Sequence, residues 1–145
     1  MKHLLKSIAV LGALVLAASC TTKEYYLESC QSYDLNVRNG MWVANTDELG
    51  GTYYSCQFDV PDLTSDIYNF GLVTCYVDYD GAQQQLPCVR HCHQLEEDEY
   101  GEYDYQWTET TDFEFSVGSV TVYFTASDFY GELPASMLFR LVLTR

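Results

Sequence analysis

One short segment is the one place in the sequence where histidine and cysteine, side chains of the metal-ligand type, cluster. It runs from Cys88 to His93 and holds the two histidines that follow residue 20. If this segment is a strand, His91 and His93 share one face, so two imidazoles can approach one metal ion. We take His91, His93, Glu97 and Cys92 as candidate ligands of a transition metal. The alternative is an exposed strand end with two solvated imidazoles.

The order His91, His93, Glu97 resembles half of the first motif of the cupin family. Gln85 stands where that motif has a glycine, and no histidine follows His93 to complete a site. The sequence therefore offers only a partial metal site, and we expect no metal cofactor.

Five cysteines follow residue 20, and an odd number leaves at least one thiol free or paired between chains. Cys56 and Cys75 fall on apolar faces of predicted adjacent strands, where they either form a disulfide or fill the core. Cys88 is a second candidate partner for Cys75. Cys88 and Cys92 on one strand are about 13 Å apart, which exceeds the reach of a disulfide. The pairing, including that of Cys30, stays open.

Catalytic patterns are scarce. Serine-histidine-aspartate catalysis needs a histidine in a pocket beside a serine, and no Gly-x-Ser-x-Gly precedes a predicted helix. A thiol nucleophile would need a histidine from another part of the chain, and no phosphate-binding loop is present. Nothing singles out a carboxylate pair among 21 acidic residues. We expect no enzyme, with a metal-dependent activity at His91 and His93 as the one exception.

The chain is strongly acidic. Seven Lys and Arg residues face 21 Asp and Glu residues, which gives a formal charge of -14. Nucleic-acid binding requires a basic surface, so we exclude it. The most acidic run, from Glu96 to Asp104, lacks the ordered pattern of a calcium-binding loop. We expect a solvated hairpin tip there, with calcium binding as an open alternative.

The N-terminal residues are typical of a secretory signal peptide. Lys2 and Lys6 precede an uncharged apolar run over residues 8–18, which is too short to span a bilayer. Small residues then lead to Cys20, an arrangement that resembles the bacterial lipobox. The resemblance implies removal of residues 1–19, a covalent lipid on Cys20 and anchoring in a membrane. Thr21 follows the cysteine, which favours the outer membrane, facing either the surface or the periplasm.

We expect residues 20–40, which are polar, to form a tether, and residues 41–145 to form one domain. From residue 41 the apolar residues alternate with polar ones, which indicates half-buried strands. About seven short strands without a long helical pattern predict an antiparallel β-sandwich. The clearest strands lie at residues 52–60, 72–79, 120–126 and 137–144.

Turn signals separate these strands. Asp80-Gly81 suits a hairpin turn, and Gly118 lies in the link between two strands. A short helical turn is predicted over residues 62–69, capped by Asp62 and ended by Gly71.

Aromatic residues are the remaining clue to function. All 22 follow residue 20, and 13 are tyrosines, a residue type enriched at interfaces. Tyrosines on predicted polar faces or in the acidic loop could stack on sugar rings or contact a protein; the alternative is that they fill sheet edges and corners. These are Tyr53, Tyr76, Tyr100, Tyr103, Tyr105 and Tyr123.

Several motifs together resemble a family of small Bacteroidetes lipoproteins with a single all-β domain. They are Tyr-Tyr-x-Cys-x-Phe-Asp-Val-Pro-Asp-Leu-Thr-x-Asp-Ile-Tyr (53–68), Gly-Leu-Val-x-Cys-Tyr-Val (71–77), Gln-x-Leu-Pro-x-Val-Arg-His (84–91), Ser-Asp-Phe (127–129) and Met-x-Phe-Arg-Leu-Val-Leu (137–143). The resemblance implies the membrane location and the all-β fold, and it implies no catalytic residue. Relatives often have aromatic residues at positions 88 and 92, which argues against a metal site common to the family.

The sequence as a whole predicts a membrane-anchored, non-catalytic binding module for a glycan or a protein. A structural envelope lipoprotein without a specific ligand is the main alternative, and a metal-binding protein at residues 88–93 is the other.

Overall fold

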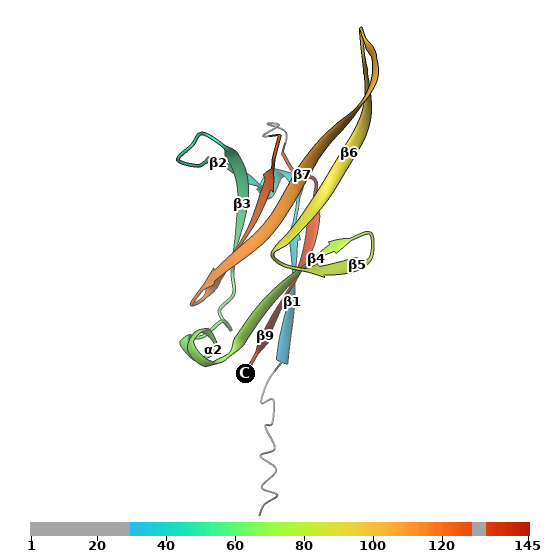
Figure 1. The fold of residues 1–145 in the computed structure, drawn as a ribbon. Coiled ribbons are helices and arrows are strands. Elements are labelled where there is room, and N and C mark those ends of the chain that lie inside the picture. Colours follow the sequence, from blue (N-terminus) through green and yellow to red (C-terminus); the bar gives the residue numbers. More distant parts are fainter. Residues whose placement is uncertain (1–29, 129–132) are drawn as a thin grey trace, which may run out of the picture.

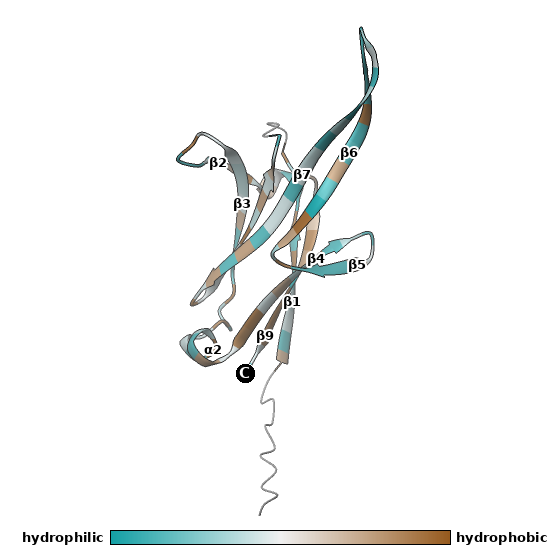
Figure 2. Cartoon of the chain, viewed as in Figure 1, coloured by the Kyte–Doolittle hydropathy of each residue, from teal (hydrophilic) through white to brown (hydrophobic). Residues whose placement is uncertain are grey.

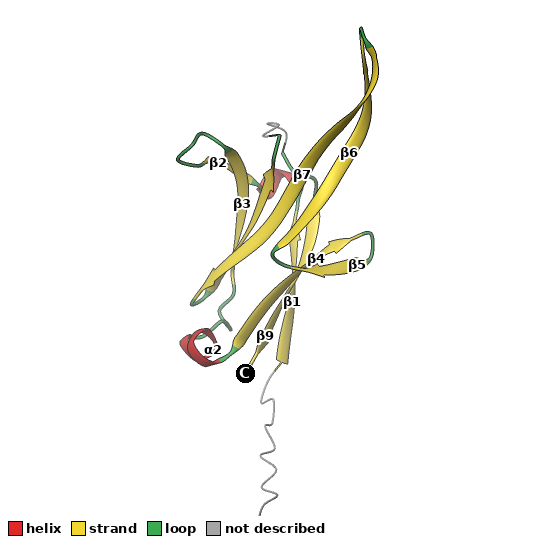
Figure 3. Cartoon of the chain, viewed as in Figure 1, coloured by secondary structure: helices red, strands yellow, loops and turns green. Residues whose placement is uncertain are grey.

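The computed structural model describes residues 30–128 and 133–145, which form two antiparallel sheets packed face to face (Figures 1 and 3). One sheet has the strand order β1-β9-β4-β5, and the other has the order β2-β3-β8-β7-β6. The predicted antiparallel β-sandwich is confirmed. The strands are β1 (Cys30–Val37), β2 (Val43–Thr46), β3 (Thr52–Asp59), β4 (Leu72–Tyr79), β5 (Ala82–Gln85), β6 (Cys88–Asp98), β7 (Gly101–Ser116), β8 (Ser119–Ala126) and β9 (Met137–Thr144).

The strongly alternating segments fold as predicted. β4 and β9 span the expected residues 72–79 and 137–144, and β3 and β8 each differ from expectation by one residue at an end. The described residues contain nine strands rather than about seven, because short polar segments also pair. β5, with the sequence AQQQ, has four exposed residues and no apolar alternation to reveal it.

The predicted tether over residues 20–40 is wrong for its second half. Cys30–Val37 forms β1 and pairs with β9 along its whole length. Only Leu35 and Val37 of this edge strand are buried, so the segment is polar in composition although it belongs to the sheet. The domain therefore includes Cys30 onward, and the residues before Cys30 lie outside the described part.

The core lies between the two sheets. The side chains of β4 and β9 meet those of β3 and β8 there, and Trp42 packs against Phe124 and Phe139. The Trp42 indole also donates a hydrogen bond to the carbonyl of Ala135 (3.1 Å). This bond ties the segment that precedes β9 to the core.

One short α-helix, α2 (Ser65–Phe70), lies at an end of the sandwich. Its N-cap is Thr64, whose hydroxyl accepts a hydrogen bond from the Ile67 amide, and not the predicted Asp62. Asp62 instead accepts a hydrogen bond from the Tyr33 hydroxyl. Gly71 ends the helix as predicted.

The predicted tight turns are confirmed. Asp80 and Gly81 have φ angles of 54° and 85° between β4 and β5, and Gly118 has a φ of 84° between β7 and β8. Both turns thus require the left-handed backbone that glycine adopts at low cost. No helix within residues 30–128 and 133–145 is long and apolar enough to cross a membrane.

Candidate functional site

The paired strands β6 and β7 form a long ribbon that extends well beyond the rest of the sandwich (Figure 1). Its two faces differ, because successive side chains point to opposite sides. Arg90 and Cys92 share the inner face with Trp107 and Glu109, whereas His91 and His93 lie on the outer face. The ribbon is mainly hydrophilic away from the core (Figure 2).

The candidate metal ligands are divided between these faces. His91, His93 and Glu97 lie on the outer face, and Cys92 lies on the inner face. Glu97 is four residues beyond His93, or about 13 Å along a strand, too far to share an ion with it. The imidazole of His93 instead lies 3.1 Å from Asp104 Oδ1. Among the described residues, no three His, Cys, Asp or Glu side chains converge on a metal position.

The acidic segment forms the expected hairpin tip. Asp98 Oδ1 accepts a hydrogen bond from the Tyr100 amide (2.7 Å), and Gly101 has a φ of 121°. Hydrogen bonds from Gln106, and then from His93, hold the pKa of Asp104 below its usual value. Asp98 and Asp104 thus find their hydrogen-bond partners within the exposed ribbon itself.

The five described cysteines are free thiols. Cys56 belongs to β3 and Cys75 to β4, so they lie in different sheets and not on adjacent strands as predicted. Both are buried, in keeping with the alternative that they fill the core. Burial raises the pKa of Cys75 to about 12. Cys88 begins β6 rather than the strand that pairs with β4 across the hairpin turn.

The six candidate tyrosines do not form one surface. Tyr53 and Tyr123 pair on the outer face of the five-stranded sheet, with ring centroids 6.1 Å apart. Tyr76 lies on the outer face of the other sheet, and Tyr100 is in the tip. Tyr103 and Tyr105 share a different face, the inner side of the ribbon.

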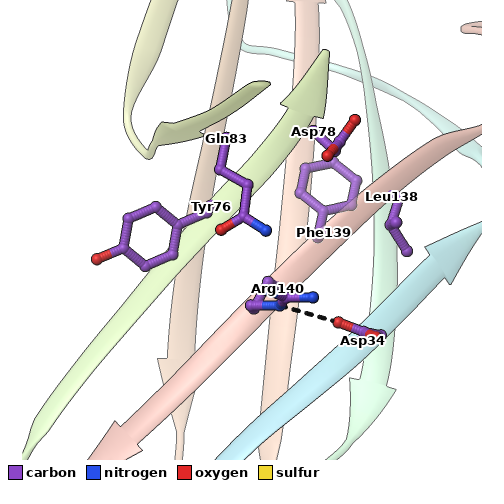
Figure 4. Close-up of a pocket in the computed structure, with 7 residues that line it drawn as sticks. All are labelled: Asp34, Tyr76, Asp78, Gln83, Leu138, Phe139 and Arg140. Atoms are coloured by element: carbon purple, nitrogen blue, oxygen red, sulfur yellow. Dashed lines mark hydrogen bonds and ion pairs between the residues drawn. The ribbon is translucent and has the colours of Figure 1, made fainter. Parts of the chain in front are cut away.

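Tyr76 borders a small hollow on the four-stranded sheet (Figure 4). Arg140 crosses its floor and forms an ion pair with Asp34, with 3.1 Å between Nε and Oδ1. The volume of the hollow, about 40 Å³, is close to that of one water molecule. This surface is therefore too small for a sugar or another organic ligand.

A much larger space lies along the inner face of the ribbon, and we name it the ribbon groove. It consists of two hollows of about 570 and 330 Å³, the volume range of ligand sites, with Glu109, Phe124, Pro134 and Ala135 lining both. The larger hollow is also lined by Gln94, Glu96, Tyr105, Trp107, Ala126 and Asp128.

The second wall of the ribbon groove is the segment before β9. The side-chain amide of Asn39 donates a hydrogen bond to the carbonyl of Pro134 (3.0 Å), and its backbone N–H donates one to Ser136 Oγ (3.1 Å). Together with the bond from Trp42 to Ala135, these contacts hold residues 134–136 in place. The groove is thus bounded by a fixed wall and a strand pair.

Two aromatic rings form a platform in the ribbon groove. The ring centroids of Tyr105 and Trp107 are 5.8 Å apart, and their planes differ by 34°. The Trp107 indole donates to Glu109 (3.2 Å), and the Tyr105 hydroxyl donates to Asp128 (3.3 Å). Because their polar groups are held at the edges, both rings offer their partly exposed faces to the groove.

The Cys92 thiol lies on the inner face opposite Trp107 in register. Burial, and then the negative charge of Glu109, raises the pKa of Cys92. Since the thiolate is the nucleophilic form, this environment disfavours thiol catalysis in the groove.

Trp107 and Glu109 were not among the residues singled out from the sequence. A usable signal was present, because Tyr103, Tyr105, Trp107 and Glu109 recur at every second residue of one strand. The other wall, at residues 134–136, has no such signal, since only the fold brings it to the ribbon.

Comparison of the chain with protein-family models, with curated proteins and with solved structures finds no match. The ribbon groove is therefore interpreted from its own residues.

Proposed function

We propose that this protein is a lipid-anchored, non-catalytic binding module that holds a neutral glycan in the ribbon groove. The observation that supports this most is the Tyr105–Trp107 platform inside a groove bordered by carboxylates. Aromatic faces pack against the apolar C–H faces of sugar rings, and carboxylates and amides accept hydrogen bonds from sugar hydroxyls. A groove of this size suits one or two sugar rings better than a protein surface.

The charges of the groove favour a neutral ligand. Glu96, Glu109 and Asp128 line it, whereas Arg90 is its one lining cation among the described residues and already lies over the Tyr79 ring. An anionic glycan would face net repulsion. The hydroxyls of a neutral glycan can instead donate hydrogen bonds to the same carboxylates.

The spacing of Glu96 and Glu109 argues against their acting together as a hydrolytic pair. Glu109 of β7 lies opposite Arg90 of β6, and Glu96 is six residues beyond Arg90 along β6. That separation is about 20 Å, whereas glycoside hydrolysis needs two carboxyl groups within about 10 Å. The alternative of an envelope protein without a ligand has no role for a groove with an aromatic floor.

A direct test is a screen of the full chain in detergent micelles against an array of neutral glycans. We expect Trp107→Ala to lower the affinity for a binding glycan at least about tenfold, since it removes the stacking face. Tyr53→Ala, which removes a ring of the outer-face pair, should leave affinity unchanged. Binding that is insensitive to Trp107→Ala, or the absence of any glycan ligand, would contradict the proposal.

The anchor, which depends on residues outside the described part, has its own test. Cys20→Ser should move the protein from the membrane fraction to the soluble fraction and abolish incorporation of a labelled fatty acid. Cys30→Ser is the matched control, because Cys30 is an exposed thiol of β1 and should change neither property. An unlabelled wild-type protein would contradict anchoring without affecting the glycan proposal.

A further inference from the structure

We propose that one end of the sandwich rests on the lipid bilayer. This inference builds on the proposed lipid anchor and is independent of the glycan in the groove. It concerns five exposed apolar side chains, which we call the apolar end: Tyr68, Phe70, Leu72, Phe115 and Val117.

The apolar end lies where α2, the β7–β8 turn and the start of β4 meet (Figure 1). The rings of Tyr68 and Phe115 are in contact, with centroids 5.8 Å apart. Phe70 is 78% exposed and Leu72 60% exposed. Single exposed apolar residues are ordinary, but a cluster with three aromatic rings at one end marks a surface that is covered in use.

The N-terminal strand begins at this same end. Cys30 and Leu72 both pair with Thr144, so they flank β9 and lie about 10 Å apart. Nine residues separate Cys20 from Cys30 in the sequence, and such a segment spans at most about 36 Å. A lipid on Cys20 therefore holds the apolar end near the bilayer.

The opposite end of the molecule has the opposite character. The acidic tip of the ribbon, around Tyr100, is separated from Ser116 by the whole length of the 16-residue strand β7, or about 50 Å. The tip would be repelled by anionic headgroups. The hydropathy colouring shows the apolar ends of β4 and β7 beside α2 and the more hydrophilic ribbon far from them (Figure 2).

Two acidic groups near the apolar end have partners. Asp66 forms an ion pair with Arg145, and Asp62 accepts a hydrogen bond from Tyr33. The ion pair offsets the charge of Asp66, which would otherwise oppose contact with lipid. Aromatic rings at a bilayer interface place their apolar faces toward the acyl chains, as Tyr68, Phe70 and Phe115 would do.

The test uses the full, acylated chain in phosphatidylcholine vesicles with brominated acyl chains, which quench nearby tryptophan emission. Phe70→Trp adds a reporter at the apolar end, and Tyr100→Trp adds a matched reporter at the tip, where Tyr100 is 89% exposed. We expect brominated lipid to lower the added emission of Phe70→Trp at least twofold. The added emission of Tyr100→Trp should not change.

Flotation of the vesicles separates the two ways of failing. If the protein floats but the added tryptophan of Phe70→Trp is not quenched, the docking proposal is overturned and the anchor is retained. If the protein does not float, the anchor and the docking that depends on it both fail. Self-association that shields Phe70→Trp from brominated lipid would assign the apolar end to a second copy and overturn the proposal.

Discussion

The guanidinium carbon of Arg90 lies 4.0 Å from the centroid of the Tyr79 ring. Arg90 belongs to β6 and Tyr79 to β4, so this contact joins the two sheets where the ribbon groove begins. The Tyr79 hydroxyl also lies 3.1 Å from the hydroxyl of Thr111, a fully buried residue of β7. Tyr79 therefore connects one sheet to two polar groups of the other.

Tyr79→Phe should lower the free energy of unfolding by about 1 kcal/mol, because the buried Thr111 hydroxyl loses its partner. Chemical denaturation of the full chain measures this change. Tyr68→Phe is the matched control, since Tyr68 is half exposed at the surface, and a change within about 0.5 kcal/mol is expected. Equal effects of the two variants would contradict a role for the hydroxyl pair.

Gly71→Ala should destabilise the protein by about 1–3 kcal/mol through overpacking. A Cβ atom at Gly71 would lie 2.6 Å from the carbonyl oxygen of Thr144 and 2.8 Å from that of Ile67, so backbone would have to move. Gly40→Ala has no atom within 4 Å of the added Cβ and is the control. A thermal unfolding midpoint for Gly71→Ala equal to that of Gly40→Ala would refute the close approach.

The stability of the protein should fall as the pH rises from about 10 to about 12. Burial, and then a hydrogen bond to Glu114, raises the pKa of Tyr123 to about 12, whereas an unfolded tyrosine has a pKa near 10. The folded state thus keeps a proton that the unfolded state releases, and the stability present below pH 10 is lost through this window.

Tyr123→Phe should therefore show a shallower loss of unfolding free energy over that range. Glu114→Gln should lower the pKa of Tyr123 in an ultraviolet titration, because it removes the carboxylate that favours the protonated phenol. Glu48→Gln, which removes a charge in the turn between β2 and β3, is the control. Parallel curves for wild type and Tyr123→Phe would show that Tyr123 does not contribute.

Thiol alkylation of the reduced protein should distinguish the cysteines. Cys75 is fully buried and its pKa is raised to about 12, whereas Cys30 is exposed. We expect Cys75 to react at least about tenfold more slowly than Cys30 at neutral pH, and at the same rate once the protein is denatured. Mass spectrometry of the alkylated peptides measures both rates. Rapid modification of Cys75 in the native state would place it outside the core.

Much of the ribbon groove could have been anticipated from one strand. Tyr103, Tyr105, Trp107 and Glu109 alternate along β7, and alternation is a local property that places side chains on one face. The same property argues against one of the candidate metal ligands, since His91 and His93 share a face but Cys92 lies on the other. The alternation predicts faces correctly but does not say which face meets the core.

The sequence by itself determined the fold class, the positions of the alternating strands and the tight turns at Gly81 and Gly118, because these depend on neighbouring residues. The lipid anchor stays a prediction from the sequence. Only the tertiary structure decided that Cys30–Val37 pairs with β9 and that residues 134–136 form the wall facing the ribbon. The first contact joins segments about a hundred residues apart, and the second joins segments with β8 between them. Their energy comes from pairing and burial that no local pattern encodes.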